Sequence, residues 1–262
     1  MTRVLSGAVL VAMAVAAVWW ASEQVFFGVA LAVTLAASHE LMDLARASGL
    51  TMPRLPAVFA ALLVLAVTVA PIPASILAVT LMAALLALGL LTLGSWRGGR
   101  DALATVSASL LPSIYVALPI AALVAIRAQG GPPALFLLML TVMISDTAQY
   151  YAGRAFGRRL LAPTISPKKT IEGAIGGFVF GSATLAIAGT WWLPAIPGWL
   201  RAVVGAAVVA LGIGGDLFES MLKRSAGVKD SSSLIPGHGG VLDRIDALLF
   251  AAPVYYVVVM NL

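Results

Sequence analysis

The segment 220–246 places basic side chains, carboxylates and glycines between two apolar stretches. Its charged residues are Lys223, Arg224, Lys229, Asp230, Asp243, Arg244 and Asp246. A Pro-Gly-His-Gly-Gly turn occupies 236–240. Basic side chains bind phosphate, and carboxylates bind hard metal ions. This mixture at a membrane boundary indicates an enzyme that acts on a phosphorylated lipid.

The acidic residues are spaced to share helix faces. Asp216, Glu219 and Lys223 follow an i, i+3, i+7 pattern, and Asp243 and Asp246 are three residues apart. Carboxylates inside a bilayer need a partner, and Mg²⁺ prefers oxygen ligands. We therefore expect a magnesium site formed by Asp216 and Asp243, with help from Asp246. The alternative is a set of inter-helix ion pairs, whose basic members are Lys223, Arg224 and Arg244.

The polar loop around this turn suits an anion. Ser231, Ser232 and Ser233 offer hydroxyl and amide donors, and the glycines allow backbone N–H groups to face a phosphate. His238 lies among those glycines, where it contacts phosphate, transfers a proton or only forms structural hydrogen bonds. Gly212, Gly214 and Gly215 precede Asp216, and they permit close helix packing or, nearest the acid, the approach of a phosphate.

A second polar group covers 146–173. Asp146 lies on a predicted helix, and Ser166-Pro167-Lys168-Lys169-Thr170 precedes the next one. Lysines, a hydroxyl and a helix N-terminus together suit a triphosphate. The alternative is a basic anchor attracted to anionic lipid, which we favour for Arg158 and Arg159. Glu40, beside His39, is either a site residue or a packed, paired acid, and we leave it outside the predicted site.

The elements that must position these residues are apolar helices. The chain has 262 residues, of which 61% are hydrophobic and 10% charged, with a mean hydropathy of +1.03. Such a composition predicts an all-α, polytopic membrane bundle in one domain, 1–262, with N-terminal helices in 1–130 and catalytic helices and loops in 131–262. About nine spans are predicted, at 4–20, 24–42, 55–70, 73–94, 103–126, 133–153, 171–192, 202–222 and 240–260. We interpret the first as a retained anchor and not as a cleaved signal peptide. The absence of Cys excludes disulfides and thiolate metal sites.

The basic residues predict an orientation. With a cytoplasmic N-terminus, 14 of the 16 Lys and Arg residues fall on the cytoplasmic side, and Arg127 and Arg201 are the exceptions. At ~1.5 Å per helical residue, the carboxylates lie in the cytoplasmic third of a ~30 Å core. Four acids are expected to meet in that layer: Asp146, Asp216, Asp243 and Asp246.

Other function classes fit less well. The sequence contains no P-loop, H-E-x-x-H or G-x-S-x-G motif, and no D-G-x-x-A-R pattern of the CDP-alcohol phosphotransferases. A transporter or ion channel would also use intramembrane acids, but the charges gather on one side and no inverted repeat is visible. A lipid-binding scaffold would account for the lysines but not for the paired acids.

The 220–246 segment resembles the defining motif of the phosphatidate cytidylyltransferases, or CDP-diacylglycerol synthases. The matching positions are Ser220, Lys223, Arg224, Lys229, Asp230, Pro236, His238, Gly239, Gly240, Asp243, Arg244 and Asp246. The 146–173 segment resembles the family's second conserved region through Ser166 to Thr170 and Glu172-Gly173. Two departures are Gln149, where a small residue is expected, and Ala247, where Ser is common.

The resemblance implies the reaction of CTP with phosphatidate to give CDP-diacylglycerol and pyrophosphate. It also implies Mg²⁺, a second monovalent cation such as K⁺, a homodimer, and an inner-membrane enzyme whose active site faces the cytoplasm. We expect membrane lipid as a partner and no nucleic acid. The residues expected to act in catalysis are Asp216, Asp243, Asp246, Lys223 and His238. Those expected to bind substrate are Ser166, Lys168, Lys169, Thr170, Arg224, Lys229, Asp230 and Arg244.

Overall fold

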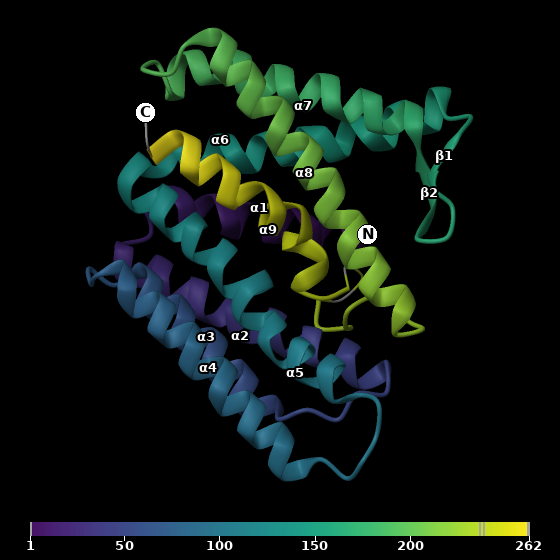
Figure 1. Ribbon diagram of the computed structural model, residues 1–262. Helices are drawn as coiled ribbons and strands as arrows, with labels where there is room; N and C mark the ends of the chain where they lie inside the picture. Colours follow the sequence, from purple (N-terminus) through teal and green to yellow (C-terminus); the bar gives the residue numbers. More distant parts are fainter. Residues whose placement is uncertain (1, 236, 238, 261–262) are drawn as a thin grey trace. The chain divides into compact units, whose positions relative to one another are not determined.

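The structure is a computed structural model that describes residues 2–235, 237 and 239–260. It is all-α apart from one short hairpin (Figure 1). In chain order the described elements are α1 (Thr2–Trp20), α2 (Glu23–Ala47), α3 (Arg54–Val69), α4 (Ala74–Ser95), α5 (Ala102–Leu111), the π-helical η1 (Pro112–Ala117), α6 (Leu118–Phe156), β1 (Leu160–Ala162), β2 (Ser166–Thr170), α7 (Ile171–Trp192), α8 (Gly198–Ser225) and α9 (Leu242–Met260). Each apolar segment expected from the sequence is therefore helical within the described residues.

Five helical segments of the described chain are long and apolar enough to cross a membrane. They are Glu23–Ala47, Ala74–Ser95, Ala102–Phe156, Ile171–Trp192 and Gly198–Ser225. Two further apolar helices, Gly7–Trp20 and Arg54–Val69, are shorter. The count of about nine spans and the cytoplasmic N-terminus stay predictions.

The break between the expected spans 103–126 and 133–153 lies inside α6. Gly131 has φ 75° and ψ 173°, outside the helical region, and Pro132 and Pro133 follow it. A left-handed φ is easy only for glycine, and proline has no N–H for the helical ladder. These residues therefore divide α6 into two helical stretches.

Arg127 and Arg201, the exceptions to the predicted charge asymmetry, both bind the C-terminal ends of helices. The Arg127 side chain is buried and donates hydrogen bonds to the carbonyl oxygens of Val18, at 2.9 Å, and Ala21. Arg201 Nη1 donates to the carbonyl of Gly189, in the last turn of α7, at 2.9 Å. The last carbonyls of a helix lack intrahelical donors, so a cation stabilises them.

The chain divides into two compact units, each described by itself. Unit 1 contains Met1–Ala12, Ser22–Val124 and Leu222–Arg244, and unit 2 contains Met13–Ala21, Ala125–Met221 and Ile245–Leu262. In unit 1, α3 packs against α2, α4 and η1, and its buried side chains include Ala57, Ala61 and Leu65.

In unit 2, α7 lies along the second half of α6, and the β1–β2 hairpin connects the two helices (Figure 1). Gly173, Gly177 and Gly181 form a stripe of buried small residues on α7. A Cβ added to Gly177 would lie 2.9 Å from the carbonyl oxygen of Ser145 on α6. Small residues allow this close approach of helix backbones. The stripe thereby fixes the part of α6 that carries Asp146.

The glycines before Asp216 have different surroundings. A Cβ on Gly215 would lie 2.6 Å from the carbonyl oxygen of Asp246, and one on Gly212 would make an ordinary contact with Ala247 at 3.7 Å. Gly214 has open space where its Cβ would be. Gly212 and Gly215 therefore serve the packing of α8 against α9.

Candidate functional site

Unit 2 contains a charged group that we call the Lys169 cluster: Asp146 on α6, Lys169 on β2 and Asp216 on α8. The Lys169 ammonium forms an ion pair with Asp216 Oδ2. Asp146 lies within electrostatic range of both groups and accepts a hydrogen bond from Gln149 Nε2 at 2.9 Å. The Lys169 and Asp216 side chains are 21% and 28% exposed, so a polar ligand can reach them.

The hairpin determines which residues of 166–170 enter this cluster. Strands β1 and β2 pair antiparallel, with Leu160 opposite Thr170 and Ala162 opposite Ser166. Successive side chains of a strand leave on opposite faces. Lys169 accordingly reaches Asp216, whereas its neighbour Lys168 is exposed.

Thr170 and Glu172 have structural contacts at the start of α7. Thr170 Oγ1 accepts a hydrogen bond from the Gly173 N–H at 3.1 Å and caps the helix. Glu172 Oε2 accepts from the backbone N–H groups of Arg158, at 3.0 Å, and Arg159, at 3.2 Å. The Thr170 hydroxyl keeps its own proton for another acceptor. The Ser-Pro-Lys-Lys-Thr and Glu-Gly motifs thus build the hairpin as well as offering cations.

Unit 1 contains a second charged group, the Asp243 cluster, formed by Lys223, Ser231, Gly240 and Asp243. Lys223 Nζ lies 2.5 Å from Asp243 Oδ1. Asp243 Oδ2 accepts hydrogen bonds from the Ser231 N–H at 3.0 Å, the Ser231 hydroxyl at 2.8 Å and the Gly240 N–H at 2.7 Å. The side chain of Asp243 is only 5% exposed. These donors satisfy a carboxylate that is costly to bury alone.

The two glycines at the end of the turn are required by this packing. Gly239 has φ 78°, and a Cβ there would lie 2.5 Å from Asp243 Oδ2. A Cβ on Gly240 would collide with Ser231 Oγ and Glu40 Oε2. The glycines of the motif therefore let the backbone close around the carboxylates.

Glu40 is a residue that the sequence analysis left outside the site, and the structure places it against the Asp243 cluster. Its side chain is 4% exposed and accepts four hydrogen bonds, three from the loop before α9 and one from Leu242, the first residue of α9. The signal in the sequence was an acid inside an apolar helix, which needs donors. His39, beside it, instead accepts from Arg54 Nε at 3.0 Å, and Arg54 pairs with Asp43.

The other predicted residues have local contacts or are exposed. Arg224 donates to the carbonyl of Val228 at 2.8 Å. Asp246 belongs to unit 2, and its Oδ1 accepts from the Ala247 N–H at 2.7 Å. Ser166 is half-buried in the hairpin, and the remaining side chains, those of Lys229, Asp230 and Arg244, are exposed. His238, predicted to act in catalysis, and Pro236 lie outside the described residues.

The ion-pair alternative is confirmed in part. Lys223 and Asp243 form one of the expected pairs, while Asp216 pairs with Lys169, which was expected to bind triphosphate. Asp216 and Asp243 belong to different units, so their convergence stays a prediction.

The donor chemistry fits a hard cation. Across the described ranges 2–235, 237 and 239–260, no group of three or more Asp, Glu, His or Cys side chains is gathered as a metal site. Mg²⁺ usually takes one or two protein carboxylates and completes its shell with water and substrate phosphates. In the Lys169 cluster, the Asp216 carboxylate already binds one cation, the Lys169 ammonium. The Ser220 hydroxyl, another oxygen, lies 3.4 Å from Asp216 Oδ1. Asp216 therefore offers the oxygen ligands that Mg²⁺ prefers.

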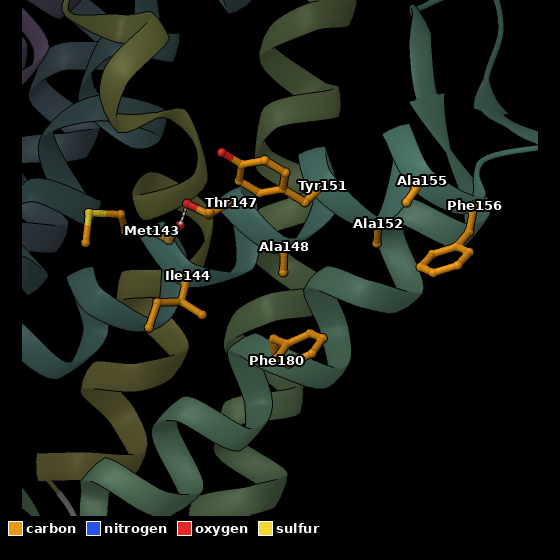
Figure 2. A pocket seen from close by; sticks show the side chains of 9 residues that line it. All are labelled: Met143, Ile144, Thr147, Ala148, Tyr151, Ala152, Ala155, Phe156 and Phe180. Carbon is orange, nitrogen blue, oxygen red and sulfur yellow. Dashed lines mark hydrogen bonds between the residues drawn. The ribbon is translucent and has the colours of Figure 1, made fainter. Parts of the chain in front are cut away.

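An apolar groove of about 540 Å³ follows α6 between Met143 and Phe156. It is lined by side chains of α6 from Met143 to Phe156 and by Phe180 of α7, as Figure 2 shows. Two of its lining side chains carry a hydroxyl: Thr147, which donates to the Met143 carbonyl at 2.8 Å, and Tyr151. The groove therefore presents an almost wholly apolar surface, suited to hydrocarbon.

A comparison with protein families identifies the chain. The model of the cytidylyltransferase family matches residues 1–262. The chain belongs to this family. The chain is 43% identical over 125 residues to a phosphatidate cytidylyltransferase of Aquifex aeolicus, a match that covers 47% of this chain and 46% of the relative. It is 46% identical over 135 residues to one of Haemophilus influenzae, covering 46% and 44%.

A phosphatidate cytidylyltransferase of Pseudomonas aeruginosa is 47% identical to this chain over 119 residues, covering 45% of this chain and 44% of the relative. The chain thus spans about half the length of the curated relatives it matches. The family assignment agrees with the chemistry of both clusters, in which lysines lie beside carboxylates.

Proposed function

We propose that this chain is a phosphatidate cytidylyltransferase, which converts CTP and phosphatidate to CDP-diacylglycerol and pyrophosphate. The observation that carries the proposal is the match of the cytidylyltransferase family over the whole chain. The names of the relatives supply the substrates, and the apolar groove along α6 supports a lipid as one of them.

The basic residues bind and orient two anions that otherwise repel each other. Lys169, with Lys168, Ser166 and Thr170 of the same hairpin, binds the triphosphate. The second basic set receives the phosphatidate headgroup or the departing pyrophosphate, and consists of Lys223, Arg224 and Lys229. Charge-assisted hydrogen bonds of this kind are stronger than neutral ones, and they hold the reacting groups in place.

The reaction needs no strong general base. An oxygen of the phosphatidate phosphate forms a bond to the α-phosphorus of CTP, and the bond from that phosphorus to the oxygen of the β-phosphate breaks. The electron pair leaves with pyrophosphate. The attacking phosphate already carries about −1.5 to −2 charges at neutral pH, so no proton has to be removed. His238 and Asp230 orient the groups, and the cations supply most of the stabilisation.

Asp216, Asp243 and Asp246 would hold Mg²⁺, which when bound neutralises the triphosphate and the leaving pyrophosphate. A monovalent cation such as K⁺ is a second proposed ion. Before the ion and substrate bind, the carboxylates hold the ammonium groups of Lys169 and Lys223 in place.

The proposal extends to the arrangement in the cell. We place the enzyme in the inner membrane as a homodimer of single-domain subunits, each with about nine spans, a cytoplasmic N-terminus and a cytoplasmic active site. The acyl chains of phosphatidate then stay in the inner leaflet, and nucleic acid is not a partner.

A purified-protein assay tests the function. The protein in mixed micelles is incubated with labelled CTP and phosphatidate, with and without Mg²⁺. We expect labelled CDP-diacylglycerol and equimolar pyrophosphate only when Mg²⁺ is present. Diacylglycerol in place of phosphatidate is the control, because it lacks the attacking phosphate. No labelled lipid in the complete mixture, from folded protein, would contradict the proposal.

A further inference from the structure

The side chain of Glu40, on α2, is connected to a segment about two hundred residues later in the chain. Glu40 Oε1 accepts hydrogen bonds from the Ser232 hydroxyl at 2.7 Å and the Val241 N–H at 2.9 Å. Glu40 Oε2 accepts from the Ser231 hydroxyl at 2.9 Å and the Leu242 N–H at 2.8 Å. Each carboxylate oxygen therefore binds one hydroxyl and one backbone N–H.

Because the Glu40 carboxylate is buried, it depends on these hydrogen bonds. Glu40 is 4% exposed, and a carboxylate removed from water needs donors on both oxygens. Val241 and Leu242 stand at the start of α9, where backbone N–H groups lack intrahelical acceptors. Glu40 therefore satisfies the first donors of α9, and those donors satisfy Glu40.

Ser231 joins Glu40 directly to the Asp243 cluster. Its hydroxyl oxygen lies 2.9 Å from Glu40 Oε2 and 2.8 Å from Asp243 Oδ2. A serine hydroxyl has one proton and donates to one carboxylate at a time. The Ser231 N–H and the Gly240 N–H also reach Asp243 Oδ2, so the same loop contacts both acids.

We propose that Glu40 is a positioning residue of the cytidylyltransferase site, which acts through Ser231 and the start of α9 to orient Asp243 toward Lys223. Glu40 itself contacts no substrate in this assignment. The activity part of the proposal rests on the proposed function, whereas the contacts of Glu40 do not.

Glutamine is a sharp probe of this role, because it has nearly the shape of glutamate. An amide has one oxygen and one NH₂ group, which donates and does not accept. If the NH₂ replaces Oε1 it faces the Val241 N–H, and if it replaces Oε2 it faces the Leu242 N–H. Either orientation sets two donors against each other, and a backbone N–H cannot change its role.

The experiment compares Glu40→Gln with Glu23→Gln, a matched control with an exposed carboxylate on the same helix. We expect Glu40→Gln to lower kcat/KM by about 10- to 100-fold, the usual effect of removing a group that orients an active-site carboxylate, and to raise the Mg²⁺ concentration for half-maximal activity. Amide hydrogen exchange should rise in the peptides that contain Ser231 and Leu242, and stay at the wild-type level in α3 and α7. Glu23→Gln should behave as wild type.

Several outcomes would overturn the assignment. Wild-type exchange and activity in Glu40→Gln would do so, as would faster exchange throughout the protein with an unchanged Mg²⁺ requirement, which indicates general destabilisation. If Glu40→Gln fails to accumulate, Ser232→Ala removes one donor to Oε1 and should raise the same local exchange; no change there overturns the proposal. An inactive wild type would refute the proposed function, and the exchange data would still test the Glu40 contacts.

Discussion

Lys169 and Lys223 are each held by a carboxylate, which orients the ammonium group within its own cluster. An ammonium group is a flexible point charge on a long stem, and an acidic partner restricts it. Both pairs are less than one-third exposed. At this scale we expect the chemistry to depend on single charges.

Lys169→Met tests the cation of the hairpin. The change keeps most of the side-chain volume but removes the charge expected to bind triphosphate. We expect kcat/KM for CTP to fall by about 100-fold, comparable to the loss of one charge-stabilising donor in other enzymes. Steady-state kinetics at varied CTP measure this. Arg158→Met is the control, since that exposed side chain is assigned to lipid attraction, and an equal loss in both variants would contradict a specific role for Lys169.

Asp216→Asn and Asp243→Asn test the acids of the two clusters. Each change removes the charge of a proposed Mg²⁺ ligand, so CDP-diacylglycerol formation should fall at least about 100-fold while the protein stays folded. Activity is measured with labelled CTP, and folding by size-exclusion chromatography in detergent. Asp43→Asn, whose side chain is 53% exposed and pairs with Arg54, should keep its activity. Wild-type turnover by Asp216→Asn or Asp243→Asn would refute its metal role.

At the scale of the element, backbone approach decides where these charges lie. The glycine stripe on α7 lets that helix contact the turn of α6 that carries Asp146, and the alternation of β2 selects Lys169 over Lys168 for Asp216. The hairpin is too short to be stable alone, so the two helices that flank it must support it.

Gly177→Ala tests the helix contact. The added Cβ would lie 2.9 Å from the Ser145 carbonyl oxygen and would also meet the Gln149 side chain, so α7 must move away from α6. Overpacking of this kind costs about 1–3 kcal/mol. We expect a lower Tm in a thermal-shift assay and reduced activity. Gly89→Ala on α4, where nothing lies within 4 Å, should not lower the Tm, and equal shifts in the two variants would argue against the stripe.

At the scale of the whole molecule, the distribution of charge predicts which ends of the helices face the cytoplasm. Arg127 and Arg201 depart from the asymmetry, and both bind helix C-termini, which gives them a structural reason to lie where they do. The remaining basic residues are those expected to attract CTP and anionic lipid to one side of the membrane.

The absence of cysteine makes this orientation directly testable. We introduce Ala47→Cys at the end of α2 and Ala128→Cys before the break in α6, both at exposed positions. A membrane-impermeant thiol reagent should label Ala128→Cys in spheroplasts and Ala47→Cys only after permeabilisation. The cysteine-free parent controls for background. The reverse labelling pattern would refute the cytoplasmic N-terminus.

The sequence predicted the helices well, because their signal is local. Apolar runs separated by Pro, Gly and charged residues fix where a helix begins and ends, and the break at Gly131 lies between the spans 103–126 and 133–153. The strand Ser166–Thr170 was not predicted, since a five-residue segment with a proline has no clear strand pattern.

The sequence by itself also determined the chemistry: lysines and carboxylates in two segments, 146–173 and 220–246, with the glycines that their turns need. Only the tertiary structure decided the partners. Asp216 forms an ion pair with Lys169, 47 residues away, and Glu40 accepts a hydrogen bond from Ser231, 191 residues away. A motif reports which groups are available, but which of them meet depends on helix rotation and backbone approach, and these are set by packing between segments distant in the chain.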